Sequence, residues 1–332
     1  MARSGIMNRR HWLRTAALGA GALLLPREAA AWNVVRHNDR DYVTGRDVAQ
    51  FYRFPEYRVQ GNRVTFRTAD FWMRGTIGGH ELVIRGVKFI LSLPIESRNG
   101  EALFSRLDLV KLVDPVLRPD YIRGTPDFST VVIDPGHGGH DPGARGPFGD
   151  EKTFALRTAL QLETILRSLR YQVVMTRSDD RFVSLSDRVA IANRHPRSVF
   201  ISLHFNDAAN RSARGIETFA LAPEGAASTL RRWREDNLDR RRGNLRDAEN
   251  IALATAAHSG SLRQVASHNP VDRGIKRARF TVISGIAMPG ILFEGGFVRH
   301  AQEGRLISTP SYQRLLAQGL AAGVRNYRAA LR

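Results

Sequence analysis

Three residues that could take part in metal-dependent chemistry follow apolar runs in this sequence. His137 comes after "VVID", His204 ends "VFISLH", and Glu294 ends "GILFE". Each run predicts a buried strand. Sites in open α/β sheets form beyond the carboxyl ends of the strands. We therefore expect the three side chains to lie near one edge of a sheet.

Glu151 is a fourth candidate, because it opens a predicted helix on that helix's apolar face. Stepping four residues back from Ala155 leads to Glu151, so its carboxylate points along the buried stripe. That stripe is traced through Ala155, Ala159, Leu162, Leu166 and Leu169. A carboxylate in such a place needs a cation or hydrogen-bond donors. The alternative is a first-turn glutamate favoured by the helix dipole, with Asp150 as the cap.

Two histidines and one carboxylate with an open fourth position are typical of a catalytic zinc site. The metal lowers the pKa of its bound water to ~7 and polarises the scissile carbonyl. A separate glutamate then takes the proton and delivers it to the leaving group. Simpler interpretations remain open: His204 as a satisfied core histidine, and Glu294 as a buried carboxylate that accepts from loop amides.

The loop around His137 is rich in glycine, and its sequence is "VVIDPGHGGHDPGA" over 131–144. It lacks the Lys-Ser/Thr pair of a phosphate-binding loop, and its glycine spacing does not match the dinucleotide fingerprint. Glycine allows backbone and substrate to approach closely. We interpret the loop as one that presents a metal ligand.

The amino-acid composition limits the classes of molecule that this chain is expected to bind. The formal net charge is +18, almost wholly from arginine, which favours nucleic acid, anionic lipid or an anionic wall polymer as a partner. No basic motif with interleaved aromatic residues favours nucleic acid. The chain has no cysteine, so any metal must be bound by His, Asp or Glu.

Residues 1–31 have the pattern of an export signal, with a charged start, a short apolar stretch and small residues before Trp32. Arg9 and Arg10 indicate the twin-arginine type, although a general secretory signal is the alternative. We expect cleavage after Ala31, no transmembrane segment, and a periplasmic or wall-associated protein. Such a protein meets the cell wall and not DNA.

The remaining chain is expected to contain two structural regions. Residues 32–119 predict a small α+β module with strands around Gly-containing turns and a helix over 105–115 that Pro115 ends. Residues 120–127 predict a linker. Residues 128–332 alternate strands with helices, which predicts an α/β fold with a mostly parallel sheet covered on both faces. A charged insertion at 224–247 is expected to be a solvated helix or loop.

The motifs after residue 128 together resemble the zinc-dependent N-acetylmuramoyl-L-alanine amidases of the amidase-3 type. They run in that family's order: "VVIDPGHGGHDPGA", "GDEKTFAL", "TRSDDRFVSLSDRVAIAN", "FISLHFNDAA", "GIETFAL", "RGIKRARFTVI" and "ILFEGGFV". The resemblance implies one Zn²⁺ bound by His137, Glu151 and His204, with Glu294 as the catalytic base. It implies cleavage between N-acetylmuramic acid and the L-alanine of the stem peptide, in wall remodelling or daughter-cell separation.

Several features depart from that family or stay open. Val298, Arg299 and His300 replace the usual Ser-Asn after "EGGF", which we expect to alter the rim. Some relatives carry an inhibitory helix that an activator protein moves, and the insertion at 224–247 occupies the comparable place. Candidates for supporting or rim roles are as follows: Glu217, His140, Arg188 and Asn206. His140 is also the alternative ligand.

The N-terminal module weakly resembles the copper-amine-oxidase N-terminal-like stalk domain, which implies no copper, and wall binding is a candidate role for it. Two other functions compete with the amidase. One is a catalytically silent wall-binding protein, and the other is a zinc peptidase that cuts within the stem peptide.

Overall fold

The structure is a computed structural model that describes residues 32–122, 124–125, 127–231 and 238–331. The predicted signal segment at 1–31 lies outside the described residues. In the part of the chain that is described, no helix is long and apolar enough to span a bilayer.

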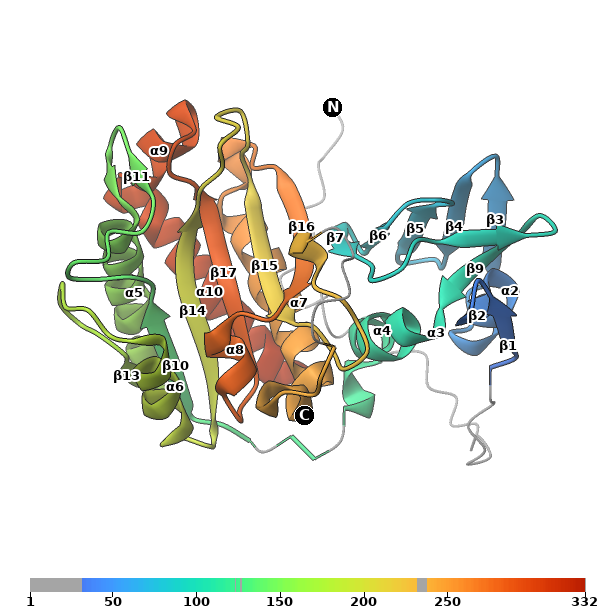
Figure 1. The fold of residues 1–332 in the computed structure, drawn as a ribbon, viewed down its shortest axis with the longest axis horizontal. Helices are drawn as coiled ribbons and strands as arrows, with labels where there is room; N and C mark the ends of the chain where they lie inside the picture. Colours follow the sequence, from blue (N-terminus) through green and yellow to red (C-terminus); the bar gives the residue numbers. More distant parts are fainter. Residues whose placement is uncertain (1–31, 123, 126, 232–237, 332) are drawn as a thin grey trace, which may run out of the picture.

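A single mixed sheet runs through most of the molecule (Figure 1). Among the described residues it has 11 strands. In spatial order they are β13 (Gln172–Met175), β10 (Thr130–Pro135), β14 (Ser198–Asn206), β17 (Gly290–Phe297), β15 (Ile216–Leu221), β16 (Asp272–Ala278), β7 (Val87–Ile90), β6 (Glu81–Ile84), β5 (Trp72–Thr76), β4 (Arg63–Arg67) and β3 (Glu56–Gln60). From β13 to β16 the neighbours are parallel, except for the antiparallel pair β15–β17. This confirms the predicted α/β class.

Helices cover both faces of this parallel region. Val131 and Ile133 of β10 face a core shared with α5 (Glu151–Ser168), α7 (Asp247–Gln264) and α10 (Pro310–Ala330). Val132 faces the opposite core with α6 (Leu185–Asn193) and α8 (Thr281–Gly285). Alternate residues of one strand thus enter different cores. The helix α9 (Ala301–Ile307) follows β17.

One residue of the predicted stripe on α5 is not buried. Ala155, Ala159, Leu162 and Leu166 have no exposed surface, but Leu169 is 39% exposed. The helix ends at Ser168, so Leu169 has left the helical face. The prediction was wrong at this position only.

The N-terminal module contains hairpins, a short helix and a second sheet. That sheet has the order β1 (Val34–His37), β2 (Arg40–Thr44), β9 (Glu101–Ser105) and β8 (Glu96–Arg98). After β2 in the chain comes α2 (Gly45–Phe51), which begins at the N-cap Thr44. The Thr44 hydroxyl accepts a hydrogen bond from the Asp47 amide.

The predicted end of a helix at Pro115 is wrong. The helix α3 (Arg106–Asp108) leads into a π-helical turn at Leu109–Val113, and α4 (Asp114–Leu117) continues through the proline. The wider turn places Pro115 in the first turn of α4, where its missing N–H is tolerated.

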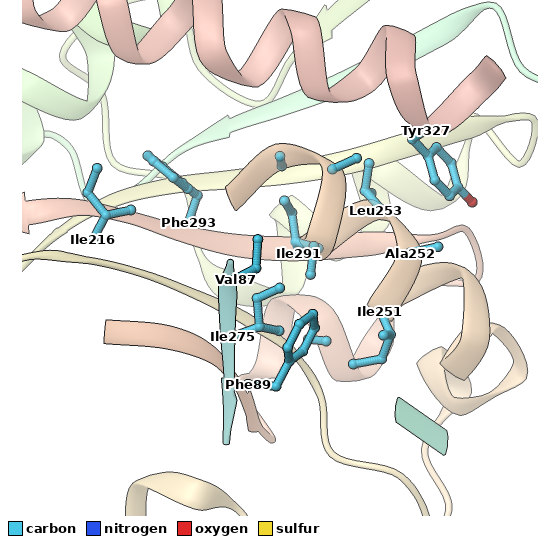
Figure 2. Packing of buried hydrophobic residues seen from close by; sticks show 14 of the residues in the cluster. Val87, Phe89, Ile216, Ile251, Ala252, Leu253, Ile275, Ile291, Phe293 and Tyr327 are labelled. Carbon is cyan, nitrogen blue, oxygen red and sulfur yellow. The ribbon is translucent and has the colours of Figure 1, made fainter. Parts of the chain in front are cut away.

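The module and the parallel region share the sheet at β7 and β16. Phe89 pairs with Ile275 in parallel register, and both side chains are fully buried with Val87 and Ile251 (Figure 2). The Lys88 amide donates to Asp272 over 3.0 Å. Arg277 of β16 forms an ion pair with Asp108 of α3, and their side chains are 1% and 3% exposed. A continuous sheet and a buried ion pair therefore cross the predicted division at 120–127.

Short elements complete the described chain. A two-stranded hairpin consists of β11 (Arg145–Gly146) and β12 (Gly149–Asp150). Single 3₁₀ turns lie at Pro119–Tyr121, Thr229–Arg231, Arg242–Arg246 and Ala266–His268. Two of these belong to the charged insertion, where Asn244 is buried and donates to the Ala222 carbonyl. The described flanks of the insertion thus contain 3₁₀ turns, and its C-terminal flank packs against the parallel region.

Candidate active site

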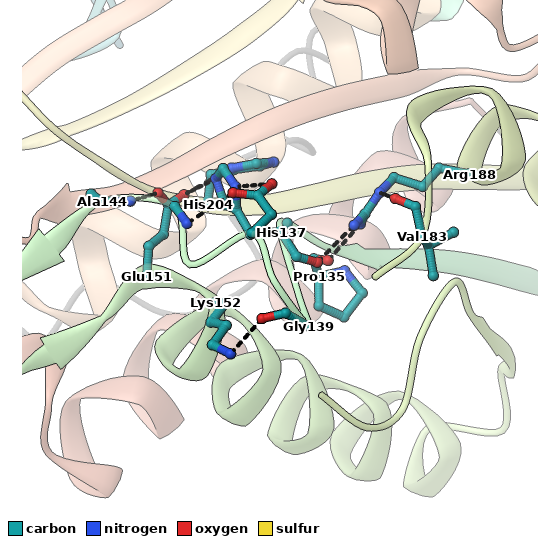
Figure 3. Close-up of polar contacts among 12 residues, drawn as sticks. Pro135, His137, Gly139, Ala144, Glu151, Lys152, Val183, Arg188 and His204 are labelled. Carbon is teal, nitrogen blue, oxygen red and sulfur yellow. Dashed lines mark hydrogen bonds and ion pairs between the residues drawn. The ribbon is translucent and has the colours of Figure 1, made fainter. Parts of the chain in front are cut away.

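Three of the predicted residues meet at the carboxyl edge of the parallel strands (Figure 3). One ligand atom from each of His137, Glu151 and His204 lies within 4.8 Å of the other two. The Oε1 atom of Glu151 is 3.1 Å from Nε2 of His137 and 2.9 Å from Nδ1 of His204. One buried carboxylate therefore faces two imidazoles, which is a donor set suited to a divalent transition metal.

The elements position these side chains with little freedom. His137 lies two residues after the end of β10 and has a φ of 59°. This left-handed conformation is uncommon for histidine and is often found at functional sites. His204 lies on β14, and Glu151 is the first residue of α5. The helix start thus delivers its carboxylate to the end of two neighbouring strands.

Two glycines make room for the ligands themselves. A Cβ atom on Gly136 would lie 2.2 Å from the ring of His204. A Cβ atom on Gly143 would lie 2.6 Å from both Glu151 Oε2 and the ring of His137. Gly136 and Gly143 are therefore required by the close packing of the three candidate ligands, which gives a physical reason for these two glycines in the loop.

Further hydrogen bonds orient the cluster. Nδ1 of His137 is 2.8 Å from Asp141 Oδ2, so its Nε2 faces Glu151. Glu151 also accepts from the amides of Ala144 at 2.9 Å and Phe205 at 3.1 Å. Sequence reasoning missed Asp141. Its place four residues after His137, inside the same loop, is the signal that could have identified it.

The pKa values of Glu151 and His137 are shifted in opposite directions. Burial alone would raise the pKa of Glu151, but hydrogen bonds and charges from His137 and His204 hold it well below its usual range. Burial would lower the pKa of His137, and Glu151 and Asp141 outweigh this effect and raise it. The raised pKa of His137 means that protonation of this imidazole competes with metal binding.

Glu294 lies beside the cluster, on the central strand β17. It is in register with His204 of β14 on one side and with Glu217 of β15 on the other. Its Oε2 atom is buried and has no hydrogen-bond partner within the described residues. Burial, followed by the charges of Glu151 and Glu217, raises its pKa well above the usual value. Such a carboxyl group is suited to proton transfer.

Glu217 belongs to a separate charged group next to Glu294. It accepts from Asn206 at 2.6 Å, Arg273 at 2.7 Å and Lys276 at 2.5 Å. Burial would raise its pKa, but Lys276 and Arg273 outweigh burial and lower it. The predicted candidates Glu217 and Asn206 are thus hydrogen-bonded to each other. The cations Arg273 and Lys276 were not predicted, because their spacing in the sequence gives no periodic signal.

Buried arginines support the loop from below. Arg188 is 2.7 Å from Asp134, and it donates to the carbonyl of His137 over 2.7 Å. Arg177 donates to the carbonyls of Pro135 and Gly136. Arg188 was predicted as a supporting or rim residue, and the structure places its guanidinium group against the backbone carbonyls of the loop. Arg177 was not predicted.

His140 does not join the cluster. It is exposed, and its ring lies 4.2 Å from that of Phe182. In the segment 298–300, which departs from the family pattern, Arg299 is 3.3 Å from Asp207. His300 caps α9 by accepting a hydrogen bond from the Glu303 amide.

The fold and the site together define a class. A His–Glu–His group at the carboxyl edge of a helix-covered α/β sheet, beside an unpartnered carboxyl group, is typical of metal-dependent hydrolases.

Comparison with known proteins is consistent with this class. Residues 131–326 match the Amidase_3 family, described as N-acetylmuramoyl-L-alanine amidase. The chain is 32% identical over 217 residues to N-acetylmuramoyl-L-alanine amidase AmiA of Escherichia coli, a match that covers 59% of this chain and 75% of that protein. It is 33% identical over 197 residues to the sporulation-specific N-acetylmuramoyl-L-alanine amidase of Bacillus subtilis, covering 58% and 66%.

A solved structure shows the same fold. The catalytic domain of CwlV, an N-acetylmuramoyl-L-alanine amidase from Bacillus (Paenibacillus) polymyxa, superposes with a TM-score of 0.51 at 32% identity, covering 61% of this chain and 99% of that domain. This chain therefore belongs to the N-acetylmuramoyl-L-alanine amidase family. The relatives support peptidoglycan amidase activity.

Proposed function

We propose that this chain hydrolyses the amide bond between N-acetylmuramic acid and the L-alanine of the stem peptide, with one Zn²⁺ bound by His137, Glu151 and His204. The convergence of these three side chains supports the proposal. The donor set fits the metal, because both imidazoles already face a single carboxylate oxygen. When bound, zinc supplies Lewis acidity and lowers the pKa of a coordinated water to ~7.

The chain's own residues move the proton and hold the geometry. Glu294 is the proposed general base: it accepts a proton from the attacking water and delivers it to the leaving nitrogen of L-alanine. Its buried and unpartnered Oε2 atom is free to take that proton. Asp141 holds the tautomer of His137, since it accepts from Nδ1 and leaves Nε2 for the metal.

We further propose that the protein is exported by its first 31 residues and acts on the wall in the periplasm or at the wall surface. Its tasks would be remodelling or daughter-cell separation. The insertion at 224–247 is the proposed place for regulation by an activator protein, because it follows the strand β15 that carries Glu217.

The test is cleavage of isolated sacculi by the wild type, by Glu294→Gln and by the chelator-treated wild type. The wild type should release peptides with an L-alanine amino terminus and leave the glycan uncut. The two impaired forms should lose roughly 10²-fold or more of the rate. Retained cleavage in both would reject the mechanism. Cuts elsewhere in the stem peptide would favour a peptidase, and an inert wild type would favour a wall-binding protein.

A further inference from the structure

One face of the β3–β5 sheet in the N-terminal module carries polar and basic side chains, together with Trp72 and one acidic residue, Glu56. Side chains alternate along these strands, so Val64, Phe66 and Met73 enter the core. The opposite face presents the exposed side chains that we call the arginine face: Arg58, Arg63, Arg67 and Arg74.

The strand register brings these guanidinium groups into one patch. Arg58 and Arg74 both lie opposite Thr65 of the strand between them, and Arg67 lies opposite Trp72. With strands ~4.8 Å apart and ~6.8 Å between alternate residues, the patch is roughly 10–14 Å across. The Arg74 guanidinium lies 4.4 Å from the centre of the Trp72 ring, which holds it in place.

The charge of this face is largely uncompensated. Glu56 is the single acidic residue in β3, β4 and β5, and its ion pair is with Arg58 at 3.6 Å. Arg63, Arg67 and Arg74 have no ion pair within the described residues. Exposed arginines without an ion pair among the described residues also lie on α5 and α10, but here four guanidinium groups lie close together on one face of a sheet. An external anion is a natural partner for such a group of cations.

The arginine face is also fixed relative to the candidate active site. Its strands continue through β6 and β7 into β16, and Arg277 forms its buried ion pair with Asp108 of the module. A polymer bound there would be held at a constant position relative to His137 and Glu151.

We propose that the arginine face binds the carboxylate-bearing stem peptides of peptidoglycan and so holds the polymer on the enzyme during cleavage. This rests on the proposed function, because it takes that polymer to be the substrate. Guanidinium groups pair with carboxylates through two parallel hydrogen bonds, and four of them on one face of a sheet can engage several stem peptides together. The face lacks the row of exposed large apolar side chains that would insert into a bilayer.

The test is a triple charge reversal, Arg63→Glu with Arg67→Glu and Arg74→Glu. A matched control reverses three exposed arginines on the helices α5 and α10: Arg157, Arg314 and Arg325. Both sets change the net charge equally. Binding to isolated sacculi is measured by co-sedimentation in the Glu294→Gln background, and thermal melting confirms that both variants fold.

The face variant should bind sacculi about tenfold or more weakly, whereas the control should stay within about threefold. Without the Glu294 change, the face variant should lose rate on sacculi relative to a soluble muropeptide. Equal losses in both variants, or no loss, would overturn the proposal. If the face variant loses binding to vesicles of anionic phospholipid but not to sacculi, the face is assigned to a membrane instead. Binding is measured without turnover. A failure of the arginine-face proposal is therefore distinguishable from a failure of the amidase proposal.

Discussion

The orienting role of Asp141 predicts a selective loss of metal affinity. Replacing Asp141 with Ala removes the acceptor for His137 Nδ1, so zinc affinity should fall about 10–100-fold. Competition with a chromogenic chelator measures this affinity. The control is His140→Ala, since that exposed ring lies outside the cluster and its loss should leave affinity unchanged. Equal affinity in wild type and Asp141→Ala would show that Asp141 does not orient His137.

Single residues at the candidate site differ in how far the sequence could reveal them. His137, His204 and Glu294 were predicted because each comes after an apolar run at a strand end, and Glu151 because helical spacing places it on a buried face. Four further residues were not predicted: Asp141, Arg177, Arg273 and Lys276. Their roles depend on the left-handed turn at His137 and on the register of β15 with β16, and neither leaves a periodic trace in the sequence.

The opposed pKa shifts of Glu151 and His137 predict a pH window for the stability of the metal-free protein. Glu151, with a lowered pKa, stabilises the fold above its unfolded pKa of ~4.5, and this contribution is lost as pH falls. His137, with a raised pKa, stabilises fully below its unfolded pKa of ~6.5, and this is lost as pH rises through the folded pKa. The difference in unfolding free energy between wild type and Glu151→Gln should therefore be greatest near pH 5–6.5.

Urea unfolding at several pH values, in the presence of a chelator, measures that difference. A difference that grows steadily from pH 6 to pH 9 would contradict the opposed shifts.

At the scale of elements, local patterns predicted most helices and strands but not how the two regions join. The hairpins of the module, α5, α7 and α10 follow from alternation and helical periodicity. The pairing of β7 with β16 does not, because it joins residues 89 and 275 and depends on a long-range contact. The π-helical turn before Pro115 was missed for a local reason: proline usually ends a helix, and a wider turn removes the conflict.

The ion pair between Arg277 and Asp108 should contribute strongly to stability. Arg277→Met leaves the Asp108 carboxylate buried without its cation, and breaking a buried pair in this way costs roughly 3–5 kcal/mol. Lys111→Ala is the control, because the Lys111 side chain is 38% exposed and its pair with Asp247 should contribute about 0–1 kcal/mol. Chemical denaturation measures both. Similar small losses in the two variants would show that the junction is not held by this pair.

At the scale of the whole molecule, the shared sheet joins the module to the catalytic region, so the two should unfold together. The tryptophans offer a direct readout. Trp32 and Trp72 lie in the module, Trp12 lies in the predicted signal segment, and Trp233 lies in the insertion. In a Trp233→Phe variant that starts at residue 32, fluorescence reports on the module, while far-ultraviolet circular dichroism reports mainly on α5, α7 and α10. Coincident urea transitions are expected, and an earlier fluorescence transition would indicate an independent module.

In the proposed mechanism one zinc ion is held by His137, Glu151 and His204 and is required for amide cleavage. The most direct measurement is the zinc content per chain, by mass spectrometry of metals, together with cleavage of a soluble muropeptide, for wild type, His204→Ala and His140→Ala. We predict one zinc per chain and full cleavage for wild type and His140→Ala, with both lost in His204→Ala. Stoichiometric zinc and undiminished cleavage in His204→Ala would contradict the account.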